Sequence, residues 1–336
     1  MIVIRRIFYL ITFLAFLLTG TLTLYYGKET FHLGSTSKVN AVPDEKAYHF
    51  VLIPEELSNE YWHLVEEGAR DAAKLHDVYL EFLGPKQADI DEHLKTIDMA
   101  IAGGVDGIMT QGISDQEFTP LLNKAVKNGI PVVTVDTDAP NSNREVYIGT
   151  DNYYAGFLAG KALIQDTKGD QDVAIITGRF EASHQKLRVQ GFKDAVQNEK
   201  RINIIAVEES NITKIGAMES TYKLLKEHPD LNAFYGTSAL DGIGIAQVVE
   251  RLKSTEGIYI MGFDTLPDTL SYIEKGTIDA TVVQFPYQMG YQAVEKLIQI
   301  KEGSNKQESI QHTKTEIFRK EDLPLLPASI KGGLNR

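Results

Sequence analysis

Residues 48–83 read YHFVLIPEELSNEYWHLVEEGARDAAKLHDVYLEFL, and this stretch decides the fold. It holds a short apolar run at 48–53, an amphipathic segment at 60–75 and a second apolar run at 78–83. Apolar runs of this length are typical of buried strands, and the longer segment between them has the period of a helix. Because parallel strands need a crossover connection, the stretch predicts one βαβ unit of a parallel sheet.

The same alternation continues along the chain. Apolar runs predict further strands at 107–110, 131–136, 172–177, 202–207, 232–237, 258–264 and 279–284. Amphipathic segments predict helices at 90–102, 117–128, 154–165, 185–197, 215–227, 242–252 and 288–300. So many strands exceed one comfortable open sheet. The pattern therefore predicts an α/β fold with two doubly wound parallel-sheet domains joined by crossovers.

Composition excludes several classes of protein. The 336 residues are 43% hydrophobic and 24% charged, as in ordinary globular domains, and include no cysteine. Disulfides, zinc–thiolate sites, a catalytic thiol and a lipoprotein anchor are therefore excluded. The formal net charge is −12, and an acidic surface repels nucleic-acid phosphates, so no nucleic-acid partner is expected. The spacing of the histidines and glycines indicates no metal site and no cofactor.

The N-terminal part of the chain differs from the rest. Residues 7–27 (IFYLITFLAFLLTGTLTLYYG) carry no charge, and a helix of this length, at about 1.5 Å per residue, crosses a hydrocarbon core of about 30 Å. Arg5 and Arg6 precede the run, which by the positive-inside rule keeps the N-terminus in the cytoplasm. We expect an N-terminal transmembrane helix within 1–30, a stalk at 31–46 and an extracytoplasmic soluble part. A cleaved signal peptide is the alternative, although its apolar region is usually shorter, about 7–15 residues.

Polar and aromatic side chains follow the predicted strands. In doubly wound folds, ligands bind beyond the carboxyl ends of the strands, where such side chains meet. The candidates are Asn59, Tyr61, Trp62, Asp136, Thr137, Lys186, Arg188, Ser238, Asp264 and Gln284. Aromatic faces that stack on C–H surfaces, beside carboxylates, amides and cations that bind hydroxyl groups, predict a pocket for a small polyhydroxylated molecule, most simply a sugar. Nothing among these residues indicates a reaction centre, so we expect no enzyme activity.

From about Tyr48 to Leu323 the chain resembles a type I periplasmic sugar-binding protein of the ribose-binding subfamily. The motifs that carry the resemblance, in family order, are FVLIPEELSNEYWHLVEEGARDAA, GVDGIMT, NGIPVVTVDTD, YIGTDNYYAGFLAG, RVQGFKDA and IMGFDTLPDTLSYIEKGTIDATVVQFPYQMGYQAVE. The resemblance implies two lobes, joined by a hinge of three crossovers, that close on a monosaccharide. The lobes would comprise 47–150 plus 285–311 and 151–284 plus 312–325, followed by a tail at 326–336.

The resemblance also implies binding roles. Family positions carry over onto Asn59, Tyr61, Trp62, Asp136, Asp264 and Gln284. The chain departs from the family pattern elsewhere. Thr137 and Lys186 stand where arginines are expected, Ser238 and Ala239 replace Asn-Asp, and Ile212 replaces an aromatic residue, whereas Arg188 is kept. Structural roles remain open at each position: an aspartate at a strand end also serves as an N-cap, an aromatic residue also fills a core, and a lysine also lies in solvent.

The membrane segment bears on what binding accomplishes. Because the chain lacks a lipobox, it resembles the membrane-anchored forms that pass lobe closure to the extracytoplasmic domain of a sensor histidine kinase, and this is the expected partner. Delivery of the sugar to the permease of an ABC importer is the alternative. A sugar-responsive repressor is excluded, because it needs a DNA-binding helix-turn-helix at the N-terminus.

Overall fold

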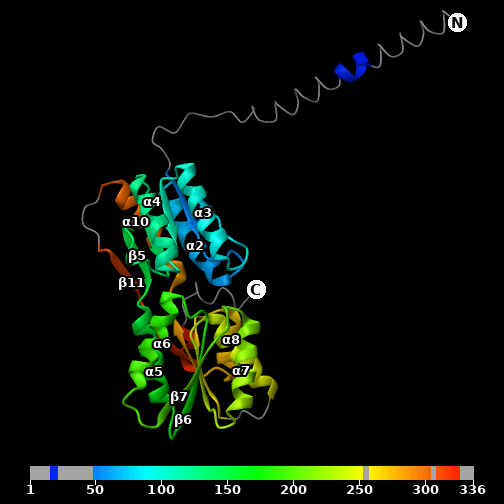
Figure 1. Cartoon of the computed structure of the whole chain (residues 1–336), viewed down its shortest axis with the longest axis vertical. Helices are drawn as coiled ribbons and strands as arrows, with labels where there is room; N and C mark the ends of the chain where they lie inside the picture. Colours follow the sequence, from blue (N-terminus) through cyan, green and yellow to red (C-terminus); the bar gives the residue numbers. More distant parts are fainter. Residues whose placement is uncertain (1–15, 22–47, 253–256, 304–307, 326–336) are drawn as a thin grey trace, which may run out of the picture. The chain divides into compact units, whose positions relative to one another are not determined.

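The computed structural model describes residues 16–21, 48–252, 257–303 and 308–325 (Figure 1). The chain divides into two units, Met1–Lys46 and Ala47–Arg336. In the first unit only residues 16–21 are described, and they are helical. The rest of the predicted transmembrane segment, the stalk and the tail at 326–336 lie outside the described residues. Within the described residues, no helix combines the length and the apolar character needed to cross a bilayer.

The second unit contains two domains, each with its own sheet. The first domain has strands β1 (His49–Ile53), β2 (Tyr79–Phe82), β3 (Gly107–Thr110), β4 (Val132–Val135), β5 (Val146–Thr150) and β11 (Ile310–Thr313). Its helices are α2 (Glu60–Leu75), α3 (Ile90–Gly103), α4 (Asp115–Lys127) and α10 (Pro286–Lys301). The strands are all parallel and lie in the order β11-β5-β4-β3-β1-β2.

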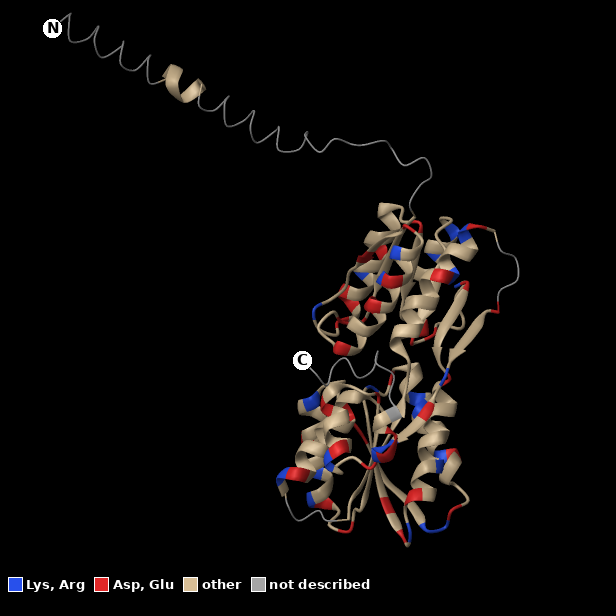
Figure 2. Ribbon diagram, turned by 180° about the vertical axis from the view of Figure 1, so that it is seen from behind, with Lys and Arg blue, Asp and Glu red and all other residues tan. Residues whose placement is uncertain are grey.

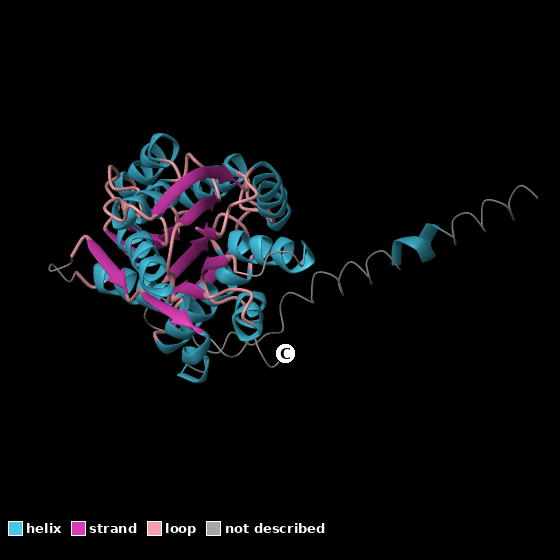
Figure 3. Cartoon of the chain, turned by 90° about the horizontal axis from the view of Figure 1, so that it is seen from below, coloured by secondary structure: helices cyan, strands magenta, loops and turns pink. Residues whose placement is uncertain are grey.

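The second domain repeats this plan. Its strands are β6 (Gln171–Thr177), β7 (Ile202–Glu209), β8 (Ala233–Gly236), β9 (Tyr259–Phe263), β10 (Ala280–Val283) and β12 (Glu316–Arg319). Its helices are α5 (Asn152–Asp166), α6 (Ser183–Val196), α7 (Lys214–Glu227), α8 (Ala239–Leu252), α9 (Pro267–Lys275) and the short 3₁₀ helix η1 (Lys320–Leu325). The order is β12-β10-β9-β8-β6-β7, with β12 antiparallel to β10. Figure 3 shows the strands enclosed by helices.

The predicted two-domain α/β fold with parallel sheets is confirmed. In each sheet the first strand of the domain lies between the second and the third, so that the chain reverses direction across the sheet beside β1 and beside β6. Such switch points open a crevice at the carboxyl ends of the strands. The prediction missed five elements, β5, α9, β11, β12 and the short 3₁₀ helix η1. It also placed the start of one helix, α8, several residues too late.

The chain crosses between the domains at three places within the described residues. They are the segments between β5 and α5, between β10 and α10, and between β11 and β12. The boundary expected between residues 311 and 312 falls inside β11. Because β11 pairs in parallel with β5, the first domain extends to Thr313, and the third crossing lies at 314–315.

Close helix packing positions the elements beside these crossings. Helix α10 lies against α2, where a Cβ built on Gly68 would come within 1.9 Å of the Tyr287 carbonyl oxygen. Helix α5 lies against α6 in the same way, since a Cβ on Gly156 would come within 1.9 Å of the Arg188 carbonyl oxygen. A larger residue at either glycine would therefore push apart the helices that begin at two of the crossings.

A buried histidine makes the first domain sensitive to acid. His93 is fully buried, its Nε2 lies 3.1 Å from the Ile53 carbonyl oxygen and 2.9 Å from the Thr110 hydroxyl, and burial lowers its pKa to about 4. The unfolded chain binds the proton from about pH 6.5 downward, so this group removes stability as the pH falls from about 6.5 to 4. We expect His93→Asn to reduce this loss of unfolding free energy by roughly 1–3 kcal/mol. Urea unfolding at about pH 7 and 5 measures the change in unfolding free energy in both proteins. An equal change in the variant and the wild type would contradict the prediction.

Candidate functional site

The carboxyl ends of both sheets face one small cavity of about 60 Å³. Its walls include residues from both domains. They are Glu55, Glu56, Asn59, Tyr61, Trp62, Gln111 and Asp136 from the first, and His184, Gln185, Arg188, Ile212, Ser238, Ala239, Leu240, Asp264 and Gln284 from the second domain and its crossing. The loops after β1, β3, β6 and β8 flank the two switch points. The cavity therefore lies where the topology places a ligand site.

Two aspartates occupy matching positions in the two domains. Asp136 follows β4 and Asp264 follows β9, which are the fourth strands of their sheets. Both have left-handed backbones, with φ of 66° for Asp136 and 65° for Asp264. This conformation is uncommon for residues other than glycine, although aspartate tolerates it better than most, and strained positions gather at functional sites. Both carboxylates line the cavity, each from its own domain.

Each aspartate is held by a different set of partners. The Tyr61 hydroxyl donates a 2.7 Å hydrogen bond to Asp136 Oδ1, and Gln111 Nε2 lies 3.3 Å from Oδ2. Gln284 Nε2 donates a 2.6 Å hydrogen bond to Asp264 Oδ1. Burial raises the pKa of Asp264 to about 6, although the positive charge of Arg188 opposes the shift. A carboxylate in this setting accepts hydrogen bonds strongly from a bound hydroxyl group.

Arg188 connects the cavity to the crossings. Its guanidinium donates to Asn152 Oδ1 at 2.8 Å, to the Thr237 carbonyl oxygen at 2.9 Å and to Gln284 Oε1 at 3.2 Å. Its centre also lies 3.9 Å from the centroid of the Phe263 ring, a cation–π geometry. Asn152 begins α5 and Gln284 precedes α10, so the arginine joins two of the interdomain segments.

An aromatic pair forms the first-domain wall. Tyr61 and Trp62 occupy the first turn of α2, with ring centroids 5.5 Å apart at an interplanar angle of 83°. Asn59 caps this helix, since its side-chain oxygen accepts from the Tyr61 N–H at 3.0 Å. The cap fixes the first turn and so the direction of both rings.

The structure brings most of the predicted residues together. Asn59, Tyr61, Trp62, Asp136, Arg188, Ser238, Asp264 and Gln284 all line the cavity. Thr137 is fully buried behind Asp136, to which its hydroxyl donates at 3.0 Å, and is not part of the wall. Lys186 is exposed on α6 and does not reach the cavity. Neither of these two side chains stands at the surface that a ligand would touch.

Sequence reasoning missed an interdomain ion pair. Glu55, which follows β1, lies 2.7 Å from Arg179 Nη1, which follows β6. Burial raises the pKa of Glu55 to about 7, against the opposing charge of Arg179. Nearby, the Thr137 hydroxyl and His184 Nδ1 make a second contact between the domains at 3.1 Å. The position of Glu55 after a strand would have marked this residue as a site candidate. No local pattern indicates that Arg179 is its partner.

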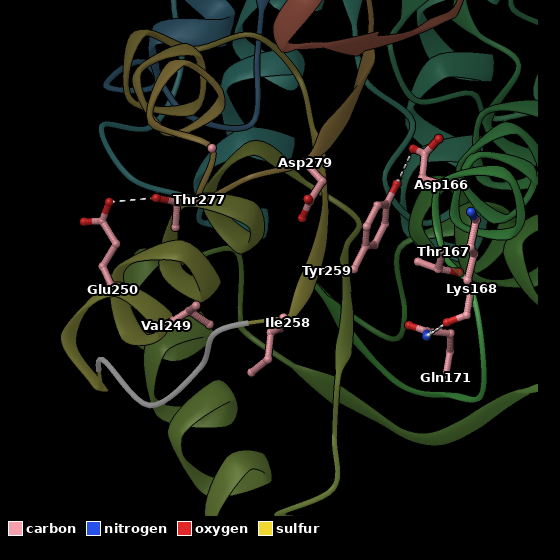
Figure 4. Close-up of a pocket in the computed structure, with 12 residues that line it drawn as sticks. Asp166, Thr167, Lys168, Gln171, Val249, Glu250, Ile258, Tyr259, Thr277 and Asp279 are labelled. Carbon is pink, nitrogen blue, oxygen red and sulfur yellow. Dashed lines mark hydrogen bonds between the residues drawn. The ribbon is translucent and has the colours of Figure 1, made fainter.

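A second cavity, of about 540 Å³, lies at the opposite ends of the second-domain strands (Figure 4). It is lined by residues at the start of β6 and β9 and at the end of α5 and α8, and Tyr259 donates to Asp166 there at 2.9 Å. None of the predicted site residues lines it. Within the described ranges, no cluster of three side chains suits a metal ion, and Figure 2 shows residues of both charges interspersed over the helices and loops.

Comparisons with known proteins place this geometry in context. A family model described as a periplasmic binding protein domain matches residues 50–305. The crystal structure of GanP, a glucose-galactose binding protein from Geobacillus stearothermophilus, is 58% identical, with a TM-score of 0.81 over 83% of this chain and all of that chain. A structure of the XylFII-LytSN complex contains a chain that is 36% identical, with a TM-score of 0.78 over 83% of this chain and all of that chain.

Among relatives matched by sequence, the D-allose-binding periplasmic protein of Escherichia coli (strain K12) is 26% identical, over 75% of this chain and 84% of that protein. The family model spans parts of both domains and two of the three crossings between them. With a family model over most of the chain and a relative of 58% identity over its full length, this chain belongs to the periplasmic binding protein domain family.

Proposed function

We propose that this protein is an extracytoplasmic sugar-binding protein that closes on a single hexose ring, glucose or galactose. The observation that carries the proposal is the pair of matching aspartates, Asp136 and Asp264, which line one cavity from opposite domains. The 58% identity to a glucose-galactose binding protein supports a hexose.

The binding residues have distinct roles in this proposal. Asp136 and Asp264 accept hydrogen bonds from ring hydroxyl groups, while Trp62 offers an apolar face to the C–H side of the ring. Gln284 and Arg188 hold Asp264 and join it to the crossings. Asn59 and Ser238 line the cavity and supply further hydrogen-bonding groups. Thr137 and Lys186 act only indirectly, because neither lines the cavity.

The proposed consequence of binding is a signal. A closed form favoured by the sugar is read by a docked protein that distinguishes closed from open. The XylFII-LytSN complex supports this role, because a relative that matches over its full length is found with a partner protein. We propose the extracytoplasmic domain of a sensor histidine kinase as the partner here, with the protein anchored by residues 1–30. Delivery to an ABC importer is the second candidate, favoured by relatives named as ribose import binding proteins.

Trp62 provides a direct test of binding. It is the only tryptophan of the chain and lies in the cavity wall, so a sugar that enters should change its fluorescence. We expect glucose or galactose to change the emission of the soluble part from about residue 45, with a saturable dependence on concentration. Calorimetry provides the independent measurement. A panel of hexoses and pentoses that gives neither signal would remove the sugar-binding proposal.

The partner and the anchor need separate tests. Crosslinking in membranes, with the sugar present and absent, should capture a histidine kinase if the signalling role is right and a permease if the importer role is right. Fractionation of cells that express the whole chain should place it in the membrane. Deletion of residues 1–30 should then release it, whereas an unchanged distribution would contradict the proposed anchor.

A further inference from the structure

A third cavity, called the outer cavity here, adjoins the proposed sugar pocket, which is called the inner pocket. It measures about 300 Å³ and shares the wall residues Glu56, Asn59 and Leu240 with the inner pocket. Small-molecule sites measure about 300–1,000 Å³. The inner pocket, at about 60 Å³, lies well below this range. With the outer cavity added, the volume available to a ligand reaches it.

The outer cavity, like the inner pocket, has walls from both domains. The first domain contributes Ser58 and Glu60 at the start of α2. The second domain contributes residues at the start of α7, α8 and α9, so the cavity is complete only when the two domains meet. A ligand that fills it would therefore favour the closed form, as the inner ring does.

The chemistry of these walls suits a sugar ring. Ile243 and Leu266 form one apolar cluster with Ala239, and both line the cavity. At the rim, Lys214 Nζ lies 3.0 Å from Asp268 Oδ2, and both side chains are well exposed. An apolar floor receives the C–H face of a pyranose, while charged groups at its edge bind the hydroxyl groups.

We propose that the outer cavity is a subsite for a second pyranose ring, joined by a glycosidic bond to the ring in the inner pocket. The protein then binds a disaccharide of glucose or galactose as well as the free hexose. This inference rests on the proposed function, because the first ring must occupy the inner pocket. In this proposal the glycosidic bond lies beside Glu56, Asn59 and Leu240, which line both the inner pocket and the outer cavity.

Calorimetry with the protein from about residue 45 tests the subsite. The probes are glucose, galactose, maltose, cellobiose, lactose, melibiose and methyl and phenyl glycosides of both hexoses. We expect at least one disaccharide to bind within about tenfold of the free hexose or more tightly. Lys214→Trp, which fills the outer cavity from its rim, should weaken that disaccharide by at least about tenfold and change hexose binding by less than about threefold.

Two variants serve as controls. Ile215→Trp adds the same ring at the next position of α7, where the side chain is 69% exposed and outside the cavity, and should leave both affinities unchanged. Lys214→Ala removes the ion pair without filling the space, and should leave hexose binding unchanged.

The outcomes separate this inference from the proposed function. Binding of a hexose without binding of any disaccharide would overturn the subsite alone. Equal loss of hexose and disaccharide affinity in Lys214→Trp would also overturn it, because the residue would then act on closure. Phenyl glycosides that bind while every disaccharide fails would make the cavity an apolar aglycone site instead. No binding of any sugar would defeat the proposed function itself.

Discussion

Replacing Asp264 with asparagine is expected to abolish sugar binding and, at the same time, to stabilise the fold. The variant loses a carboxylate that faces the cavity. Charge-assisted hydrogen bonds are worth about 1.5–3 kcal/mol each, so the loss of two should weaken binding by about a hundredfold or more. Asparagine also accepts a left-handed backbone such as the φ of 65° at this position, so the loop keeps its shape.

The gain in stability follows from the pKa of Asp264. Its pKa is raised from 3.8 to about 6 in the folded protein, so the folded form holds a proton that the unfolded chain has lost. The wild type therefore loses stability as the pH rises from about 4 to 6, and the neutral asparagine does not. At about pH 7 we expect Asp264→Asn to be more stable by roughly 1–3 kcal/mol.

Urea unfolding at several pH values and calorimetry with the best sugar measure the two effects. The advantage of the variant should shrink as the pH falls from about 6 toward 4, because the folded wild type holds a proton on this carboxyl below about pH 6 while the unfolded chain binds it only near pH 4. Asp230→Asn, an exposed change in the turn before β8 that lines neither the inner pocket nor the outer cavity, is the control and should alter neither quantity. A variant that binds sugar normally, or that loses stability at every pH, would show that Asp264 is structural.

Removing the charge of Arg179 is expected to weaken sugar binding without weakening either domain by itself. Arg179 pairs with Glu55 of the other domain at 2.7 Å, and the Glu55 side chain is only 8% exposed. In Arg179→Met the carboxylate loses its partner while it remains buried on closure, and an unpaired buried charge costs several kcal/mol. We expect the sugar to bind about tenfold to a hundredfold more weakly at about pH 9, where the wild-type carboxyl is ionised, chiefly through faster dissociation.

The pH dependence of closure carries a second signature of this pair. The pKa of Glu55 is about 7 in this structure, where the side chain is buried, and an exposed carboxyl in an open form would ionise near 4.5, so the proposed closure would take up a proton between these values. The groups that face Glu55 are Arg179, which lowers its pKa, and Glu56 and Asp136, which raise it. Without Arg179 the pKa rises further, so the affinity deficit of the variant should shrink as the pH falls from about 9 to 7 and its carboxyl takes up a proton.

Two further variants make the test selective. Glu55→Gln combined with Arg179→Met should lose less affinity than Arg179→Met, because no buried charge is left unpaired. Arg144→Met breaks an ion pair to Asp138 of 2.6 Å that lies inside the first domain. It should lower the stability of the protein but leave the dissociation rate unchanged. Dissociation rates by stopped-flow fluorescence would contradict the prediction if Arg179→Met and the wild type agreed.

Local patterns predicted the regular parts of the fold. Helix α2 was expected at 60–75 and has those bounds, because its apolar residues recur with a helical period and Asn59 supplies the cap. Strands β11 and β12 escaped prediction since their sequences, IQHT and EIFR, have little apolar pattern. They are edge strands, and pairing with β5 and β10 positions them. Such pairing joins residues far apart in the chain and leaves no local signature.

The candidate site was also predicted only in part, because some of its contacts join residues far apart in the chain. The rule that ligands meet the carboxyl ends of strands found Asp136 and Asp264 from their position alone. Lys186 and Arg188 were both expected in the pocket, but two residues along a helix differ by about 200° in direction, so only one can face it. The structure places Arg188 inside and Lys186 in solvent. The link between Glu55 and Arg179 depends on tertiary contact, which a single sequence does not reveal.

The three crossings between the domains have a mechanical consequence. They are adjacent, because β11 pairs with β5, β12 pairs with β10, and the Thr150 hydroxyl lies 2.6 Å from Gln284 Oε1. Adjacent interdomain segments of this kind form a hinge. The domains can rotate about one axis through it, but the segments resist sliding and twisting of one domain against the other. In the proposed signalling role, opening about this axis would change one angle between the domains, and that angle is what the partner would detect.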